Sequence, residues 1–234
     1  MAAAVLVGAF LNALAGFGFA LITVPLMATV VEPRQAVVLS AILGLLSNGG
    51  VAIRNRSNLQ RPIAVRVLIG AAVGMPFGLI LMLALSGDVL KILIASAVLG
   101  SVVALAAGWR IKNPTPSGDY TTGLLSGLFN TSTGIGGPPI VLLLQARGLP
   151  RAEFRATASA VFAISGVVAL TLFGIGGQFN TELFKLAAVA IPALPAGWVL
   201  GELVHRRFDE ERFRVLVLVM MCVTAGATLV TVFV

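Results

Sequence analysis

Apolar residues dominate the chain in long runs that short polar connections separate. The pattern divides the chain into eight apolar segments, near residues 2–31, 35–53, 64–85, 89–109, 120–145, 155–174, 182–204 and 212–233. Most of them reach the roughly 20 residues that a helix needs to cross a hydrocarbon core. The pattern therefore predicts an all-α polytopic membrane protein whose connections are too short to hold a soluble domain.

Composition agrees with a membrane protein and excludes several other classes. Of the 234 residues, 58% are hydrophobic and 11% are charged, more apolar material than one soluble core of this length uses. The net charge of +7 does not indicate nucleic acid as a partner, because the basic residues are spread over the connections. One cysteine, Cys222, and one histidine, His205, cannot supply the ligands of a metal site within one chain. We expect no metal and no cofactor.

The distribution of basic residues constrains the topology. The connections after the second, fourth, fifth and seventh segments hold 13 of the 16 Lys and Arg residues. If all eight segments crossed the membrane, two of these connections would face each side, against the positive-inside tendency. All four face the cytoplasm if the fifth segment enters and leaves on one side. The charges thus predict one re-entrant segment.

The composition of the fifth segment fits that role. Its middle reads Asn130-Thr131-Ser132-Thr133-Gly134-Ile135-Gly136-Gly137-Pro138-Pro139. The two prolines remove backbone donors, and the glycines permit backbone angles that other residues avoid, so a break in the helix is expected. Exposed backbone at membrane depth must be buried in protein or line a cavity. A kinked spanning helix with glycines for close packing is the alternative.

An internal repeat extends this prediction to the first segment. The matching positions are Asn12, Gly16 and Gly18 with Asn130, Gly134 and Gly136 at an offset of 118, Pro33-Arg34 and Ala41 with Pro150-Arg151 and Ala158 at 117, and Pro76-x-Gly78 with Pro195-x-Gly197 at 119. We therefore expect two repeats, 1–110 and 120–234, each with one broken Gly- and Pro-rich helix pair and three transmembrane helices. An odd number of spans inverts the second repeat. Pro76, Gly78, Pro195 and Gly197 would either bend the third and seventh segments or allow close helix packing.

Short motifs suggest a family. A Gly-rich stretch precedes Ile22-Thr23-Val24-Pro25-Leu26 near the N-terminus, and a second Gly-Gly-Pro stretch lies in mid-chain. With its eight or so apolar segments, the chain resembles the TauE/SafE family of membrane transporters, the sulfite exporter family. The resemblance implies export of sulfite, an organosulfonate or a related small anion across the bacterial plasma (inner) membrane, with most basic connections cytoplasmic.

The two broken segments are the expected substrate site. Transporters built from inverted repeats place the substrate near the midplane, where half-helix N-termini offer unpaired N–H groups that suit an anion. The candidate residues lie in these segments and on neighbouring spans: Asn12, Gly16, Phe17, Gly18, Thr23, Asn48, Asn130, Thr131, Ser132, Thr133, Gly134, Ile135, Gly136, Gly137, Pro138, Thr157 and Ser165. The alternative for their hydroxyls is a bond back to the preceding helical turn.

Charged groups contribute less to the expected mechanism. No Asp, Glu, Lys or Arg lies in the middle of a segment. Glu202 and His205 share a helix face and form a candidate gate or proton site, with an ordinary interfacial pair as the alternative. The chain offers no nucleophile and base pair for an enzyme. A transporter of a carboxylate or a neutral metabolite, and a scaffold that transports nothing, stay open as other functions.

Overall fold

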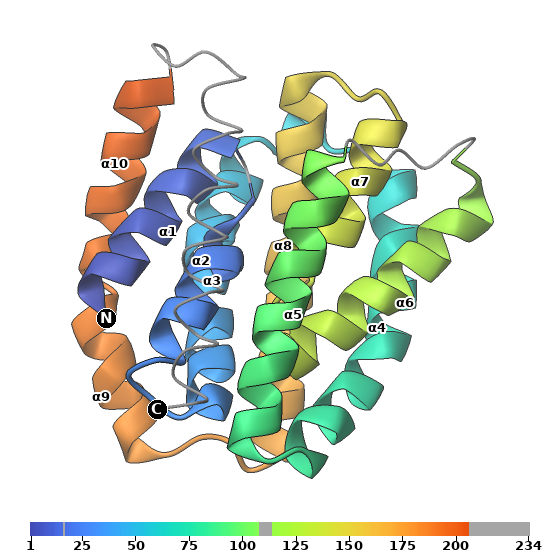
Figure 1. The fold of residues 1–234 in the computed structure, drawn as a ribbon. Coiled ribbons are helices and arrows are strands. Elements are labelled where there is room, and N and C mark those ends of the chain that lie inside the picture. Colours follow the sequence, from blue (N-terminus) through green and yellow to red (C-terminus); the bar gives the residue numbers. More distant parts are fainter. Residues whose placement is uncertain (16, 108–113, 206–234) are drawn as a thin grey trace.

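The described part of the chain is a bundle of helices (Figure 1). The computed structural model describes residues 1–15, 17–107 and 114–205, and contains no strand in those ranges. Its α-helices are α1 (Ala2–Ala15), α2 (Phe19–Met27), α3 (Pro33–Arg54), α4 (Arg61–Ala84), α5 (Gly87–Ala106), α6 (Pro116–Thr133), α7 (Gly137–Ala146), α8 (Arg151–Ile175), α9 (Thr181–Ala190) and α10 (Ala193–His205). The predicted all-α class is confirmed for these ranges, and the eighth predicted segment, 212–233, lies outside them.

Five stretches of the described chain are long and apolar enough to cross a membrane. They are Pro33–Arg54, Arg61–Ala84, Gly87–Ala104, Arg151–Ile175 and Thr181–Gly201. The last of them contains α9 and most of α10, which a turn at Ile191 and Pro192 separates. The sequence suggested bends at Pro195 and Pro76. The turn comes before Pro195, and α4 continues through Pro76 without a break.

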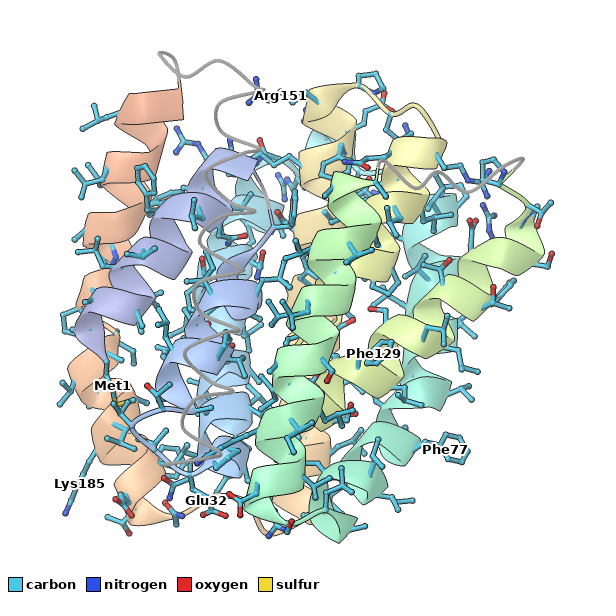
Figure 2. All side chains as sticks on the ribbon, in the orientation of Figure 1. Met1, Glu32, Phe77, Phe129, Arg151 and Lys185 are labelled. Carbon is cyan, nitrogen blue, oxygen red and sulfur yellow. The ribbon has the colours of Figure 1, made fainter. Side chains whose placement is uncertain are left out.

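The outer face of α4 is apolar and exposed. Val65, Ile69, Val73 and Phe77 follow one another at intervals of four residues, and each is at least half exposed. Phe77 extends away from the bundle in Figure 2. A row of large apolar side chains without protein cover is unfavourable in water and favourable in lipid. The row and the five spans together indicate a multi-pass membrane protein.

The opposite face of α4 packs on α6 through glycines. They are Gly70, Gly74 and Gly78 on α4 and Gly123 and Gly127 on α6. At each of them an added Cβ atom would collide with a backbone carbonyl of the other helix, as Gly74 would with Leu124. Small residues at intervals of four let membrane helices approach to backbone contact. The glycines therefore fix the α4–α6 crossing.

A second close crossing joins α1 and α10. Gly197 lies against the carbonyl of Leu6, and an added Cβ atom at Gly201 would come within 2.6 Å of the carbonyl oxygen of Phe10. Of the two roles weighed for Gly78 and Gly197, the structure thus bears out close packing.

The two described basic connections lie at one end of the bundle. The backbone N–H of Gln60, before α4, donates to Thr157 Oγ1 at 3.1 Å, and its side chain donates to Glu153 at 2.7 Å, both on α8. In Figure 2, Arg151 marks this end, and Glu32 and Lys185 lie at the opposite end. The basic residues of the α3–α4 and α7–α8 connections are therefore neighbours.

The two ends of the fifth predicted segment also meet at this end of the bundle. Asp119, in the first turn of α6, is fully buried and pairs with Arg66 at 2.8 Å and with Arg147 at 2.7 Å. Arg147 follows α7 directly, and it also donates to the carbonyl of Thr115, just before α6. A simple spanning helix would place these residues a full membrane thickness apart. Helices α6 and α7 instead form a hairpin.

Candidate functional site

The first helix break separates α1 from α2. Gly18 has a φ of 98°, in the left-handed region that glycine adopts without steric cost. It is the residue before α2 and has no side chain to cap the first turn of that helix. The predicted break in the first segment is confirmed, and Gly16 lies outside the described residues.

The second break separates α6 from α7 and has a defined local cause. Gly134 has a φ of 75°, and the N–H groups of Gly134 and Ile135 donate to the carbonyls of Asn130 and Phe129 at 3.1 and 3.3 Å. Such bonds around a left-handed glycine form a helix C-cap. The next helix begins at Gly137, so Pro138 falls in its first turn, where a missing N–H group breaks no helical bond. The predicted break in the fifth segment is confirmed.

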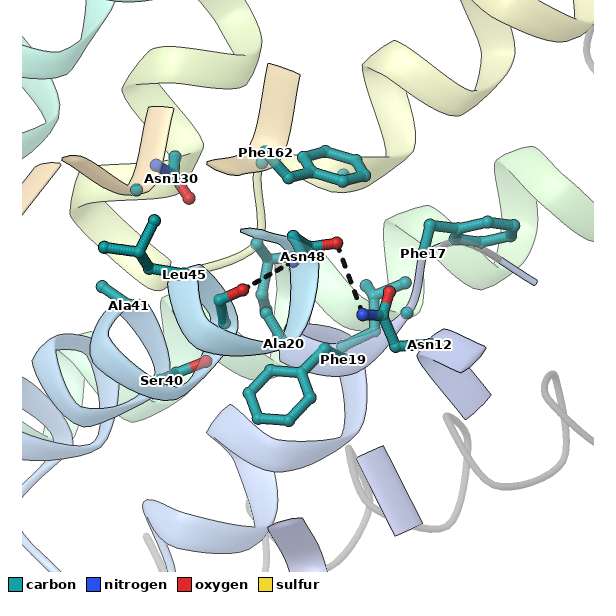
Figure 3. Close-up of a pocket in the computed structure, with 18 of the residues that line it drawn as sticks. Asn12, Phe17, Phe19, Ala20, Ser40, Ala41, Leu45, Asn48, Asn130 and Phe162 are labelled. Atoms are coloured by element: carbon teal, nitrogen blue, oxygen red, sulfur yellow. Dashed lines mark hydrogen bonds between the residues drawn. The ribbon is translucent and has the colours of Figure 1, made fainter. Parts of the chain in front are cut away.

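A cavity of about 70 Å³ lies where the two breaks approach α3 and α8 (Figure 3). One water molecule needs about 10–15 Å³ by a comparable measure, so the space suits a small solute. The lining residues are Asn12, Phe17, Gly18, Phe19, Ala20, Leu21, Val37, Ser40, Ala41, Gly44, Leu45, Asn48, Asn130, Gly134, Ile135, Gly136, Gly137, Phe162 and Gly166. The structure thus brings parts of both broken segments to one cavity.

Two asparagines of the first half form a hydrogen-bonded chain at the cavity wall. Asn48 Nδ2 donates to the carbonyl of Gly44 at 2.8 Å, and Asn48 Oδ1 accepts from Asn12 Nδ2 at 3.3 Å. Asn12 Nδ2 also donates to Ser47 Oγ at 2.8 Å. Both asparagines are buried. Buried amides normally satisfy their polar atoms, yet Asn12 Oδ1 has no hydrogen-bond partner in the described part of the chain.

Asn130 presents the other amide of the site. It lies in the last turn of α6, is half-buried, and makes no side-chain hydrogen bond to the described part of the chain. In Figure 3 it lies at the opposite side of the view from Asn12. An amide NH₂ group carries two donors, so Asn130 can donate to a solute in the cavity without breaking an existing bond.

The electrostatic character of the cavity comes from the backbone. None of its described lining residues is charged. Gly18, Phe19, Ala20 and Leu21 bring the first turn of α2 to the cavity, and Gly137 brings the first residue of α7. No side chain caps either helix at its N-cap. A helix N-terminus carries about half a positive charge on unpaired N–H groups, so the cavity is suited to an anion.

Several predicted site residues lie near the cavity without lining it. Thr131, Ser132 and Thr133 donate to the carbonyls four residues earlier at 2.7 to 3.2 Å, and Thr23 donates to Phe19 at 2.8 Å. Thr131 also bonds Met75 of α4, which joins the two helices. The residues Pro138, Thr157 and Ser165 are buried outside the lining set. For the hydroxyls on α6, the alternative of bonding back to the helix is the observed one.

The sequence suggested a gate or proton site at Glu202 and His205. Glu202 and His205 belong to α10, but their side chains lie outside the described residues.

Part of the wall was not expected from the sequence. It consists of Phe19, Ala20 and Leu21 of α2, Val37, Ser40, Ala41, Gly44 and Leu45 of α3, and Phe162 and Gly166 of α8. Most of these residues are apolar and look like any membrane-span residue. The repeat offset was the available signal, because Leu45 and Phe162 are 117 positions apart and lie at equivalent places on the two helices.

Comparison with known proteins adds to this geometry. The family model described as "Sulfite exporter TauE/SafE" matches residues 1–228. The protein described as "Probable sulfite/organosulfonate exporter TauE" from Cupriavidus necator is 25% identical over 213 residues, covering 86% of this chain and 80% of that protein. No solved structure matches the chain.

Proposed function

Because the chain belongs to the TauE/SafE sulfite exporter family, a family of membrane transporters, we propose that it exports a small anion, sulfite or an organosulfonate. The substrate would bind in the cavity between the two helix breaks. One observation carries the proposal: two helix N-termini and the side-chain amide of Asn130, which bonds no described side chain or backbone group, face a single cavity whose described lining has no charged side chain. These donors suit a sulfur oxyanion, which offers acceptor oxygens on several sides.

We further propose that the protein consists of two inverted repeats, 1–110 and 120–234. Figure 1 supports this arrangement. Helix α1 rises to its break and α2 runs back toward the lower end, whereas the outer ends of α6 and α7 both lie at the upper end. Helices α3 and α8, which occupy equivalent positions in the repeats, pack on each other. The two hairpins would enter the membrane from opposite faces.

The glycine crossings support the same relation. Gly78 of α4 lies against the carbonyl of Leu128 on α6, and Gly197 of α10 lies against the carbonyl of Leu6 and the backbone nitrogen of Phe10 on α1. Leu128 follows Phe10 by 118 positions and Gly197 follows Gly78 by 119, so matching helices of the two repeats form the two crossings. Each hairpin is then held by the second full span of the other repeat, which is α4 for the α6–α7 hairpin and α10 for the α1–α2 hairpin. Movement of one hairpin would carry a helix of the opposite repeat with it, a geometry suited to alternating access.

The basic end of the bundle would face the cytoplasm. Connections rich in arginine stay on the cytoplasmic side of most membrane proteins, and the α3–α4 and α7–α8 connections meet at one end. A singly charged anion that leaves a cell with a negative interior gains about 2.3 kcal/mol per 100 mV. Export can therefore proceed without a proton site in the cavity.

Transport by the purified protein in liposomes tests this proposal. Radiolabelled sulfite, ethanesulfonate and acetate would be followed under an imposed membrane potential, with and without a pH gradient. We expect the sulfur anions to move, and we expect Asn130→Ala to weaken their apparent affinity about tenfold or more, because a hydrogen bond to a charged group contributes about 1.5–3 kcal/mol.

The matched control is Asn58→Ala, since Asn58 is exposed in the α3–α4 connection and should not affect transport. Transport of acetate alone would replace the sulfur anion with a carboxylate as the substrate. Equal apparent affinities of wild type and Asn130→Ala would mean that the cavity is not the substrate site. If no anion is transported, the proposed function is contradicted.

A further inference from the structure

We infer that the cavity selects singly charged anions that also carry a hydrogen-bond donor, such as a hydroxyl group, over dianions and over anions that can only accept. This inference deepens the proposed function and rests on it. The substrate class it names includes hydroxyalkanesulfonates and the protonated form of sulfite, in which one oxygen carries a hydrogen.

The donor requirement comes from Asn12 Oδ1. Asn12 is 1% exposed and lines the cavity, and its Oδ1 atom has no hydrogen-bond partner among the residues that the structure describes. In Figure 3 this oxygen lies on the side of the amide that faces Phe17, another lining residue. A buried acceptor without a donor is unfavourable, and a ligand with a hydroxyl group in the cavity would supply the missing hydrogen bond. An anion with bare oxygens would face this acceptor without forming a bond.

The orientation of the Asn12 amide follows from its neighbours. Asn48 Nδ2 donates to the carbonyl of Gly44, which cannot donate in return, so Asn48 must turn Oδ1 toward Asn12. Asn12 must then present Nδ2 to Asn48, because a reversed amide would place two oxygens against each other. The atom that remains for the cavity is therefore an acceptor.

The charge requirement comes from the two helices. The N-termini of α2 and α7 each carry about half a positive charge, so together they balance about one negative charge. The described lining adds no Lys, Arg or His. A dianion would keep about one uncompensated charge in a site of low dielectric, which is unfavourable. The proposed site is thus matched in charge to a monoanion.

Competition between two matched sulfonates tests the inference. Ethanesulfonate and 2-hydroxyethanesulfonate are both singly charged and differ by one hydroxyl group, and sulfate supplies a dianion. Each would compete with radiolabelled sulfite for transport into liposomes that contain the wild-type protein. We expect 2-hydroxyethanesulfonate to compete about tenfold better than ethanesulfonate, and sulfate to compete least.

Two variants locate the effect. Asn12→Leu removes the acceptor at similar size, and we expect it to bring the two sulfonates within about twofold of each other. Ser47→Ala removes a bond that Asn12 makes outside the lining set, and it should keep the preference of the wild type.

The outcomes separate this inference from the proposed function. Equal competition by the two sulfonates in the wild type would overturn the inference and leave the sulfur-anion transporter standing. A preference that persists in a folded Asn12→Leu protein would also overturn it. If sulfite does not move and no sulfonate competes, the proposed function itself fails.

Discussion

Replacement of Asp119 by alanine should lower the free energy of unfolding by about 3 kcal/mol, the low end of the range for breaking a buried ion pair. The Asp119 side chain is fully buried between Arg66 and Arg147, whose side chains are 24% and 20% exposed. Without the carboxylate, two partly buried guanidinium groups would repel each other without a counter-ion. Because the ion pairs join α4, α6 and the end of α7, the α6–α7 hairpin should loosen as well. Equilibrium unfolding in mixed detergent micelles measures the change.

Asp88→Ala is the matched control. Asp88 is exposed in the first turn of α5, so its removal should cost less than about 1 kcal/mol through the helix dipole alone. Similar losses for the two variants would mean that the Asp119 cluster contributes no more than a surface charge, and that the hairpin ends are held by other contacts.

Gly74→Ala should destabilise the protein by about 1–3 kcal/mol, the usual cost of overpacking, although alanine is the better helix former by about 1 kcal/mol. An added Cβ atom at Gly74 would collide with the carbonyl oxygen of Leu124, so α4 and α6 would have to separate. The sign of the change is therefore opposite to the one that helix propensity predicts. Thermal unfolding of the purified protein in detergent measures it.

Gly100→Ala provides the comparison for this prediction. Gly100 lies on α5, and an added Cβ atom there meets no atom of another described helix within 4 Å. Alanine at this position should leave the unfolding temperature unchanged or raise it. If Gly74→Ala behaved like Gly100→Ala, backbone contact would not hold α6 on α4, and the proposed coupling of each hairpin to the opposite repeat would lose its main contact.

The helix breaks were predictable because their cause is local. Gly18 and Gly134 adopt backbone angles that favour glycine, and Pro138 lies in the first turn of a helix, the position that proline prefers, so the sequence marks each break directly. The repeat offset then carried the prediction from the mid-chain break to the N-terminal one. Asn12 and Asn130 were predicted as site residues because they lie in the broken segments, and Asn48 because it lies on a neighbouring span; all three line the cavity.

Other features depend on tertiary contacts that sequence patterns do not carry. Asp119 precedes the apolar part of its segment and looks like a surface residue, but two arginines from distant connections bury it. The hydroxyl of Thr133 can point to a cavity or to its own helix, and only the packed structure decides between them. Leu45 and Phe162 line the cavity because α3 and α8 pack on each other.

The position of a bound anion tests the central claim most directly. Selenite has the shape and charge of sulfite, and its selenium atom can be located by anomalous diffraction from crystals of the protein soaked with it. We predict one selenium peak in the cavity bounded by Asn12, Asn48 and Asn130, between the N-termini of α2 and α7, and its loss in Asn130→Ala crystals. A peak confined to the arginine-rich end of the bundle, or an empty cavity in a protein that transports selenite, would contradict the account.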